Sequence, residues 1–133
     1  MISYRTGNDL ELDAVIELYV DSTLGKRRPV GDRSRMHRML SHANLVLTAW
    51  DGPLMVGISR SLTDFAYATY LSDLAVRRSY QRQGIGRELI RLTREAAPEA
   101  TLILLAAPAA EKYYPHIGFE HHPQAWILRG GAS

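Results

Sequence analysis

Residues 77–89, with the sequence RRSYQRQGIGREL, decide how the rest of the chain is interpreted. Two glycines, Gly84 and Gly86, stand one residue apart after a run rich in arginine and glutamine. The apolar run YLSDLAV at 70–76 precedes them and predicts a strand. The run IGRELIRLTREAA at 85–97 follows them with apolar residues at helical spacing. We therefore predict a strand, a glycine-containing loop and a helix in immediate succession.

A helix that begins at this loop forms an anion-binding site by geometry. Its first N–H groups have no partners within the helix, and the helix dipole adds partial positive charge there. Glycine lets the backbone approach a ligand closely, and Arg82 and Arg87 add charge. Spacing excludes a Walker A loop, and Leu89 stands where a Rossmann fingerprint has its third glycine or alanine. A tight turn with solvated arginines is the structural alternative.

The length and composition indicate a globular protein. With 133 residues the chain can bury one hydrophobic core, so we expect a single domain over 1–133. No apolar run reaches the roughly 20 residues of a transmembrane helix, and the first residues lack the apolar core of a signal peptide. The sequence has no cysteine, which excludes disulfides and thiolate chemistry. We therefore expect a cytoplasmic protein and no membrane partner.

Basic residues are concentrated in two stretches, 21–42 and 77–94, although the net charge is only +2. Local basic stretches in a nearly neutral chain favour an anionic ligand over a polyanionic partner. The alternative is a small nucleic-acid binder that uses residues 26–38. That stretch has neither interleaved aromatic residues nor a known reader motif, so we expect no nucleic-acid partner.

The periodicity of the remaining sequence predicts an α+β fold. Antiparallel strands followed by a βαβ unit are typical of a mixed sheet flanked by helices. The expected order is β-α-α-β-β-β-α-β-α-β. Strands are predicted at 2–6, 45–50, 54–65, 68–76, 101–107 and 124–129, and helices at 10–19, 34–43, 84–97 and 109–119.

Several segments resemble the GNAT family of N-acetyltransferases. The sequence QRQGIG at 81–86 resembles the family signature Q/R-x-x-G-x-G/A, and SDLAV at 72–76 resembles its pantetheine-binding strand. LILLAA at 102–107 resembles the next strand, and EKYYPHIGF at 111–119 resembles the element (F/Y)-Y-x-x-x-G-F. The resemblance is specific over 70–120 and weaker over 1–65. It implies the GNAT fold, with a central mixed, mostly antiparallel sheet.

The resemblance also implies an activity, which is transfer of the acetyl group of acetyl-CoA to a primary amine by direct attack. The strand before the loop would pair its backbone with the pantetheine amides, and the loop N–H groups would hold the pyrophosphate. The strand residues are Leu74, Ala75 and Val76, and the loop residues are Arg82, Gln83, Gly84, Ile85, Gly86 and Arg87, with Gln81 at the first signature position.

Tyr114 stands at the position of the family's general acid, and Tyr113 at an aromatic packing position. A tyrosine phenol, with an ordinary pKa of about 10, can donate a proton to the departing CoA thiolate. The structural alternative is that both tyrosines are core aromatics of a short helix.

The general base is left open by the sequence. Tyr70 falls near the place where some family members have a catalytic glutamate. Asp73 on the same strand, Asp64 on the preceding strand, or a water relay are the candidates. The alternative for Asp73 is a structural hydrogen bond, because a carboxylate within a strand pattern faces a polar cleft or needs a partner. The missing glutamate also keeps open a catalytically inactive acyl-CoA-binding sensor or partner subunit.

The acceptor is not identified by the sequence beyond a small-molecule or peptide amine. Arginines in the region that corresponds to the family's acceptor site hint at a carboxylate or phosphate on it: Arg27, Arg28, Arg33 and Arg35. The histidines His116, His121 and His122 lack metal-ligand spacing, so we expect no metal. Homodimers are frequent in the family, which leaves a homodimer open here.

Overall fold

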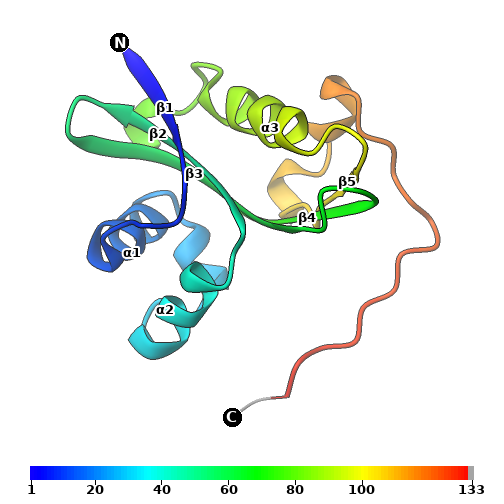
Figure 1. Cartoon of the computed structure of the whole chain (residues 1–133), viewed down its shortest axis with the longest axis horizontal. Helices are drawn as coiled ribbons and strands as arrows, with labels where there is room; N and C mark the ends of the chain where they lie inside the picture. Colours follow the sequence, from blue (N-terminus) through cyan, green and yellow to red (C-terminus); the bar gives the residue numbers. More distant parts are fainter. Residues whose placement is uncertain (132–133) are drawn as a thin grey trace.

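A five-stranded mixed sheet forms the centre of the molecule (Figure 1), in a computed structural model that describes residues 1–131. The strand order is the chain order, with antiparallel pairs up to the fourth strand and a parallel pair between the fourth and the fifth. The strands are β1 (Ile2–Thr6), β2 (Leu45–Asp51), β3 (Leu54–Thr63), β4 (Ala68–Val76) and β5 (Thr101–Ile103).

Three α-helices of the described chain cover the two faces of this sheet. The helices α1 (Leu12–Asp21) and α2 (Arg33–Ser41) pack on one face, and α3 (Ile85–Ala96) packs on the other (Figure 1). Short 3-10 turns connect the elements: η1 (Leu24–Arg27), η2 (Arg78–Tyr80), η3 (Pro108–Ala110) and η4 (Tyr114–Ile117). No helix in the described part of the chain combines the length and the apolar character needed to cross a membrane.

The alternation of side chains along a strand divides the core into two layers. On β2, Leu45 and Leu47 pack against Ile85 and Leu89 of α3, whereas Val46 lies in the cluster under α1 and α2. Both faces of β2 are apolar because both are covered. Full burial of each such side chain contributes about 1.5–3 kcal/mol.

The close approach of α3 to β3 depends on Gly57. A Cβ at this position would lie 3.1 Å from Cδ1 of Leu89 and 3.2 Å from Cγ2 of Ile85, which is tighter than ordinary van der Waals contact. The missing side chain therefore lets the first turn of α3 pack directly on the sheet. This contact fixes where the N-terminus of α3 lies.

The predicted α+β class and mixed, mostly antiparallel sheet are confirmed, but the last elements of the predicted order differ. The helix expected over 109–119 is replaced by η3 and η4, because Pro108 and Pro115 cannot donate helical N–H bonds and Gly118 ends the segment at φ 97°. The last two predicted strands also differ from the structure. The strand predicted over 101–107 is shorter, because β5 ends at Ile103. Residues 124–129 form no strand within the described chain, where no neighbouring edge pairs with them.

Candidate functional site

The strands β4 and β5 separate after three paired positions. Ala68, Thr69 and Tyr70 pair with Thr101–Ile103, and there β5 ends. β4 continues to Val76 while still pairing with β3 on its other side. Among the described residues, the edge of β4 over 71–76 that faces away from β3 has no strand partner. This edge contains Leu74, Ala75 and Val76, the residues for which the family resemblance implies pantetheine binding.

The N-terminus of α3 lies directly after this edge, through the loop at 77–84. Gly84 is the N-cap residue with φ 85°, and Glu88 donates the first backbone bond into the helix, to the Gly84 carbonyl at 3.0 Å. The N–H groups of Ile85, Gly86 and Arg87 therefore have no acceptor within the helix. Within residues 1–131 no side chain caps this end, so three N–H donors and the positive end of the helix dipole face outward.

Gly86 lies between the helix end and the open edge of β4. A Cβ added to it would point toward Cγ2 of Val76 at 3.7 Å and Cδ2 of Leu74 at 3.9 Å, which are ordinary contacts. A side chain at Gly86 would therefore occupy the space between the two elements, with its Cβ at ordinary contact distances. At Gly84 the situation is reversed, because the space is empty but the positive φ strains any other residue.

The loop is anchored to the domain by its first residues. The Arg77 N–H donates to the Val56 carbonyl at 2.8 Å, and its guanidinium binds Glu17 on α1 and the Met55 carbonyl. The Arg78 N–H donates to Asp21 at 2.8 Å. The following arginines are exposed, so they add positive charge around the helix end: Arg78, Arg82 and Arg87.

Asp73 is buried at the centre of a polar cluster. Its side chain is 0% exposed. One oxygen accepts from the Tyr19 hydroxyl and from Nε of Arg60, each at 2.6 Å. The other accepts from Nε of Arg28 at 2.6 Å and from the Ser72 hydroxyl at 3.1 Å. Both oxygens are therefore occupied by donors from the protein itself.

The charge state of Asp73 follows from these contacts. Burial alone would raise the pKa of the carboxyl, but the hydrogen bond and charge of Arg60, with the hydrogen bonds from Tyr19 and Arg28, hold the pKa below its usual range. A buried carboxylate with this many donors is a poor proton acceptor. The geometry favours the structural alternative for this residue, in which Asp73 ties η1 to β4 through Arg28.

Asp64, the second candidate base, lies at the turn between β3 and β4. One carboxylate oxygen accepts the backbone N–H groups of Ala66, Tyr67 and Ala68 at 2.9, 2.7 and 3.1 Å. These hydrogen bonds lower the pKa of the Asp64 carboxyl, and the bond from Tyr67 has the largest effect. In the structure the Asp64 side chain therefore stabilises this exposed turn.

Tyr114 is half-buried at the start of η4. Its ring packs edge-on against Tyr113, with centroids 5.3 Å apart, and against Phe119, with centroids 5.4 Å apart. Burial, followed by the neighbouring phenol of Tyr113, raises the pKa of Tyr114, and the positive charge of Arg27 opposes this rise. The phenol therefore stays protonated at neutral pH and lies within electrostatic reach of η1.

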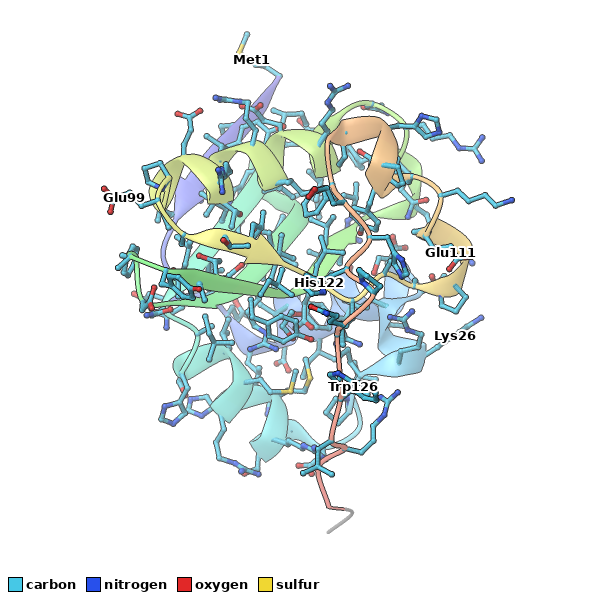
Figure 2. The ribbon with its side chains drawn as sticks, turned by 90° about the vertical axis from the view of Figure 1, so that its right-hand side faces the viewer. Met1, Lys26, Glu99, Glu111, His122 and Trp126 are labelled. Atoms are coloured by element: carbon cyan, nitrogen blue, oxygen red, sulfur yellow. The ribbon has the colours of Figure 1, made fainter. Side chains whose placement is uncertain are left out.

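The three histidines considered as metal ligands lie in the C-terminal part of the chain. His116, His121 and His122 are all exposed, and Figure 2 shows His122 on the extended segment that follows η4. In the part of the chain that the structure describes, no three His, Cys, Asp or Glu side chains come together as a metal site.

The Asp73 cluster is the feature that the sequence alone did not reveal. Its members come from α1, from the residue that follows η1, and from β3 and β4, and Tyr19 lies 54 positions from Asp73 along the chain. One signal was present, since Arg60 is the only charged residue in the run LMVGISRSLT at 54–63. A charged residue in such a position needs a buried partner.

Comparison with known proteins points to the same family that the sequence motifs resemble. The family model described as an acetyltransferase (GNAT) domain matches residues 27–131. A GNAT family acetyltransferase from Streptococcus pneumoniae has 28% sequence identity and a TM-score of 0.78, over 98% of this chain and 100% of that chain. No curated protein sequence matches the chain significantly.

More distant structures share the fold alone. A probable acetyltransferase from Staphylococcus aureus has 20% identity and a TM-score of 0.78, over 99% of this chain and 100% of that chain. The aminoglycoside N-acetyltransferase AAC(6')-Iy in complex with CoA has 15% identity and a TM-score of 0.75, over 99% of this chain and 96% of that chain.

Proposed function

The chain belongs to the GNAT acetyltransferase family, and from this premise we propose that it transfers the acetyl group of acetyl-CoA to a primary amine within one domain, residues 1–133. The observation that carries the proposal is the uncapped N-terminus of α3 beside the unpaired edge of β4. The N–H groups at the helix start and the strand edge without a strand partner match the two polar parts of CoA, its pyrophosphate and its pantetheine amides.

CoA binding relies mainly on the backbone. The edge at Leu74, Ala75 and Val76 would pair with the pantetheine amides, and Gly86 leaves the adjoining space open. One adjustment is needed, because the Gln81 side chain donates to the Val76 carbonyl at 2.9 Å and must release it if pantetheine pairs there. The pyrophosphate would be held by the N–H groups at the loop and helix start, with Gln81 at the signature's first position: Arg82, Gln83, Gly84, Ile85, Gly86 and Arg87.

The bound cofactor supplies an activated acyl thioester, and Tyr114 supplies the proton for the thiolate. As the amine nitrogen bonds to the acetyl carbon, the carbon–sulfur bond breaks and the sulfur takes the phenolic proton. A pKa raised by burial suits this role, because the phenol is fully protonated at neutral pH before the step. The tyrosinate formed is reprotonated from solvent.

The amine must lose its own proton, and we assign that step to water. Asp73 is occupied by Tyr19, Arg28 and Arg60 and so has no free oxygen for the acceptor. In this proposal Asp73 is a positioning residue that holds η1 on β4. Asp64 is assigned to its turn, and the catalytic assignment rests on Tyr114 alone.

Two of the four arginines in the expected acceptor region already bind carboxylates of the protein itself, which leaves the other two to contact an acceptor. Arg28 binds Asp73 and Arg33 binds Asp13. Arg27 and Arg35 are exposed, and Arg27 is the one whose charge reaches Tyr114. The amines to test first therefore carry a carboxylate or phosphate. Aminoglycosides, the substrates named for one distant structural relative, form the comparison set.

The test is thiol release from acetyl-CoA with a panel of amines. An enzyme releases CoA only when a suitable amine is present, and the product mass rises by one acetyl group. A sensor or partner module binds CoA by calorimetry yet releases no thiol with any amine in the panel. That second result would replace acetyl transfer with acyl-CoA binding as the function.

A further inference from the structure

A cavity lies at the β1 end of the sheet, on the face that α1 covers. Its volume of about 310 Å³ is at the lower end of the roughly 300–1,000 Å³ of small-molecule sites. Charged side chains of both signs line it, Arg5 from β1 and the carboxylates of Asp9 and Glu11 from the start of α1. Neither the proposed CoA site nor the proposed acceptor region includes these residues.

The guanidinium of Arg5 is held against an aromatic wall of this cavity. Ile2 and Tyr4 pack in the cluster under α3, so the alternation along β1 places Arg5 on the opposite face, across from Thr48 of β2. The guanidinium lies over the Trp50 ring, 4.2 Å from its centroid. The ring is itself fixed, because its indole N–H donates to the Thr48 hydroxyl at 2.8 Å.

The charges around the cavity do not neutralise one another. Among residues 1–131, no ion pair includes Arg5, Asp9 or Glu11. Glu11 is the N-cap residue of α1, yet its side chain makes no capping hydrogen bond. The guanidinium and the carboxylates therefore lie farther apart than a direct ion pair. A molecule that carries both a carboxylate and an ammonium can bind both, with charge-assisted hydrogen bonds at each end.

The rest of the cavity wall is apolar. Leu10, Trp50, Pro53 and Met55 line it. Met55 is 3% exposed, and Leu10 and Trp50 are partly buried against the core cluster under α1. An apolar group of a ligand would be removed from water against these side chains, which favours binding.

We propose that this cavity binds a free α-amino acid with an apolar side chain, such as leucine. Its carboxylate accepts from Arg5, and its ammonium donates to Asp9 and Glu11. Its side chain lies against Trp50 and Met55. The ligand has the two opposite charges and the apolar group that the three parts of the wall require, and it is small enough for the volume.

This cavity is separate from the place where acetyl transfer is proposed. The sheet order puts β1 three strands away from β4 (Figure 1). At about 4.8 Å between neighbouring strands, the two are roughly 14 Å apart. An amine held beside β1 is therefore too far from a thioester at the β4 edge to be acetylated in place, so the amino acid is a second ligand and not the acceptor.

Calorimetry of the natural chain with L-leucine, in the absence of CoA, is the first test. We expect saturable binding at one site. Two compounds with the same apolar group but a single charge serve as controls, since isoamylamine lacks the carboxylate and isocaproic acid lacks the ammonium. Each should bind at least ~10-fold more weakly, because it loses the hydrogen bonds of one charged end.

Variants identify the cavity as the place of binding. Arg5→Gln should weaken leucine binding at least ~10-fold, and so should Asp9→Asn/Glu11→Gln. All three side chains are exposed, so the melting temperature should not change. Arg38→Gln, exposed on α2, is the matched control and should bind leucine as the natural chain does.

Fluorescence gives an independent measurement. Trp126→Phe replaces a side chain that is 94% exposed and leaves Trp50 as the only tryptophan. Leucine should then change the Trp50 emission with the same midpoint as the heat of binding. Absence of saturable binding at millimolar leucine, or equal affinity in Arg5→Gln and the natural chain, would overturn the proposal. Binding that is lost in Arg27→Gln and kept in Arg5→Gln would also overturn it, because leucine would then occupy the acceptor region.

Discussion

Replacement of Asp73 by asparagine separates the two roles that a carboxylate at this position can have. The change preserves the shape of the side chain and removes its charge. In the structure it leaves Arg60, 9% exposed, and Arg28, 19% exposed, without a negative partner. Removal of one member of a buried ion pair costs about 3–5 kcal/mol. Because Arg28 can regain water, we expect the free energy of unfolding to fall by about 3 kcal/mol, the lower end of that range.

A matched control is available on the surface. Asp13 forms an ion pair with Arg33 in which the side chains are 66% and 62% exposed. Exposed pairs contribute about 0–1 kcal/mol, so Asp13→Asn should change the free energy of unfolding by less than about 1 kcal/mol. Urea unfolding of the natural chain and both variants measures the two effects side by side.

The effect of Asp73→Asn should also depend on pH. The folded state lowers the pKa of Asp73 below its unfolded value of about 3.9. Its contribution is therefore complete above that value and is lost as the pH falls through the folded pKa. The gap between the natural chain and Asp73→Asn should narrow below about pH 4, while the gap for Asp13→Asn stays small throughout.

One combination of results would refute this account of Asp73. If Asp73→Asn unfolds at nearly the same urea concentration as the natural chain, binds CoA normally, and yet loses acetyl transfer by about 100-fold, then the carboxylate acts in the reaction. In that case the residues around Asp73 would position its carboxylate as the general base.

Two further predictions concern the reaction and the loop. Tyr114→Phe removes only the phenol hydroxyl. If this group donates the proton to the thiolate, kcat should fall by about 100-fold, while CoA affinity and melting temperature stay unchanged. An unchanged kcat, with chemistry shown to be rate-limiting, would rule out Tyr114 as the general acid. The exposed Arg82 and Arg87 should make CoA binding weaker as ionic strength rises, because salt screens exposed charges. Calorimetry should then show that the CoA affinity of Arg82→Ala/Arg87→Ala depends less on salt than that of the natural chain. Equal salt dependence of the two proteins would mean that backbone groups alone hold the pyrophosphate.

The sequence predicted the junction between β4 and α3 because the relevant signals are local. A strand pattern, two glycines and a helical stripe follow each other within 28 residues, 70–97. Gly84 adopts positive φ, and a Cβ at Gly86 would make only ordinary contacts with Leu74 and Val76. The Asp73 cluster could not be predicted in this way, since its donors lie on four separate segments of the chain.

The C-terminal strand shows a different limit of sequence reasoning. Alternation and β-branched residues indicate that a segment fits a sheet, but not which edge it joins. Residues 124–129 fit that description, but in the described chain Gln124 lies in a turn and the residues that follow it belong to no helix or strand. The prediction of a strand there was wrong for the single chain because a strand requires a partner.

The central claim is that CoA binds between the α3 N-terminus and β4, and calorimetry with CoA tests it most directly. Gly86→Val fills the space toward Leu74 and Val76, where a Cβ makes ordinary contacts, and Gly31→Val places the same side chain where a Cβ has no neighbour within 4 Å. We predict that the natural chain and Gly31→Val bind CoA equally. Gly86→Val should bind at least ~10-fold more weakly, about 1.4 kcal/mol, at an unchanged melting temperature. A folded Gly86→Val protein with undiminished affinity, or a natural chain that does not bind CoA, would contradict the claim.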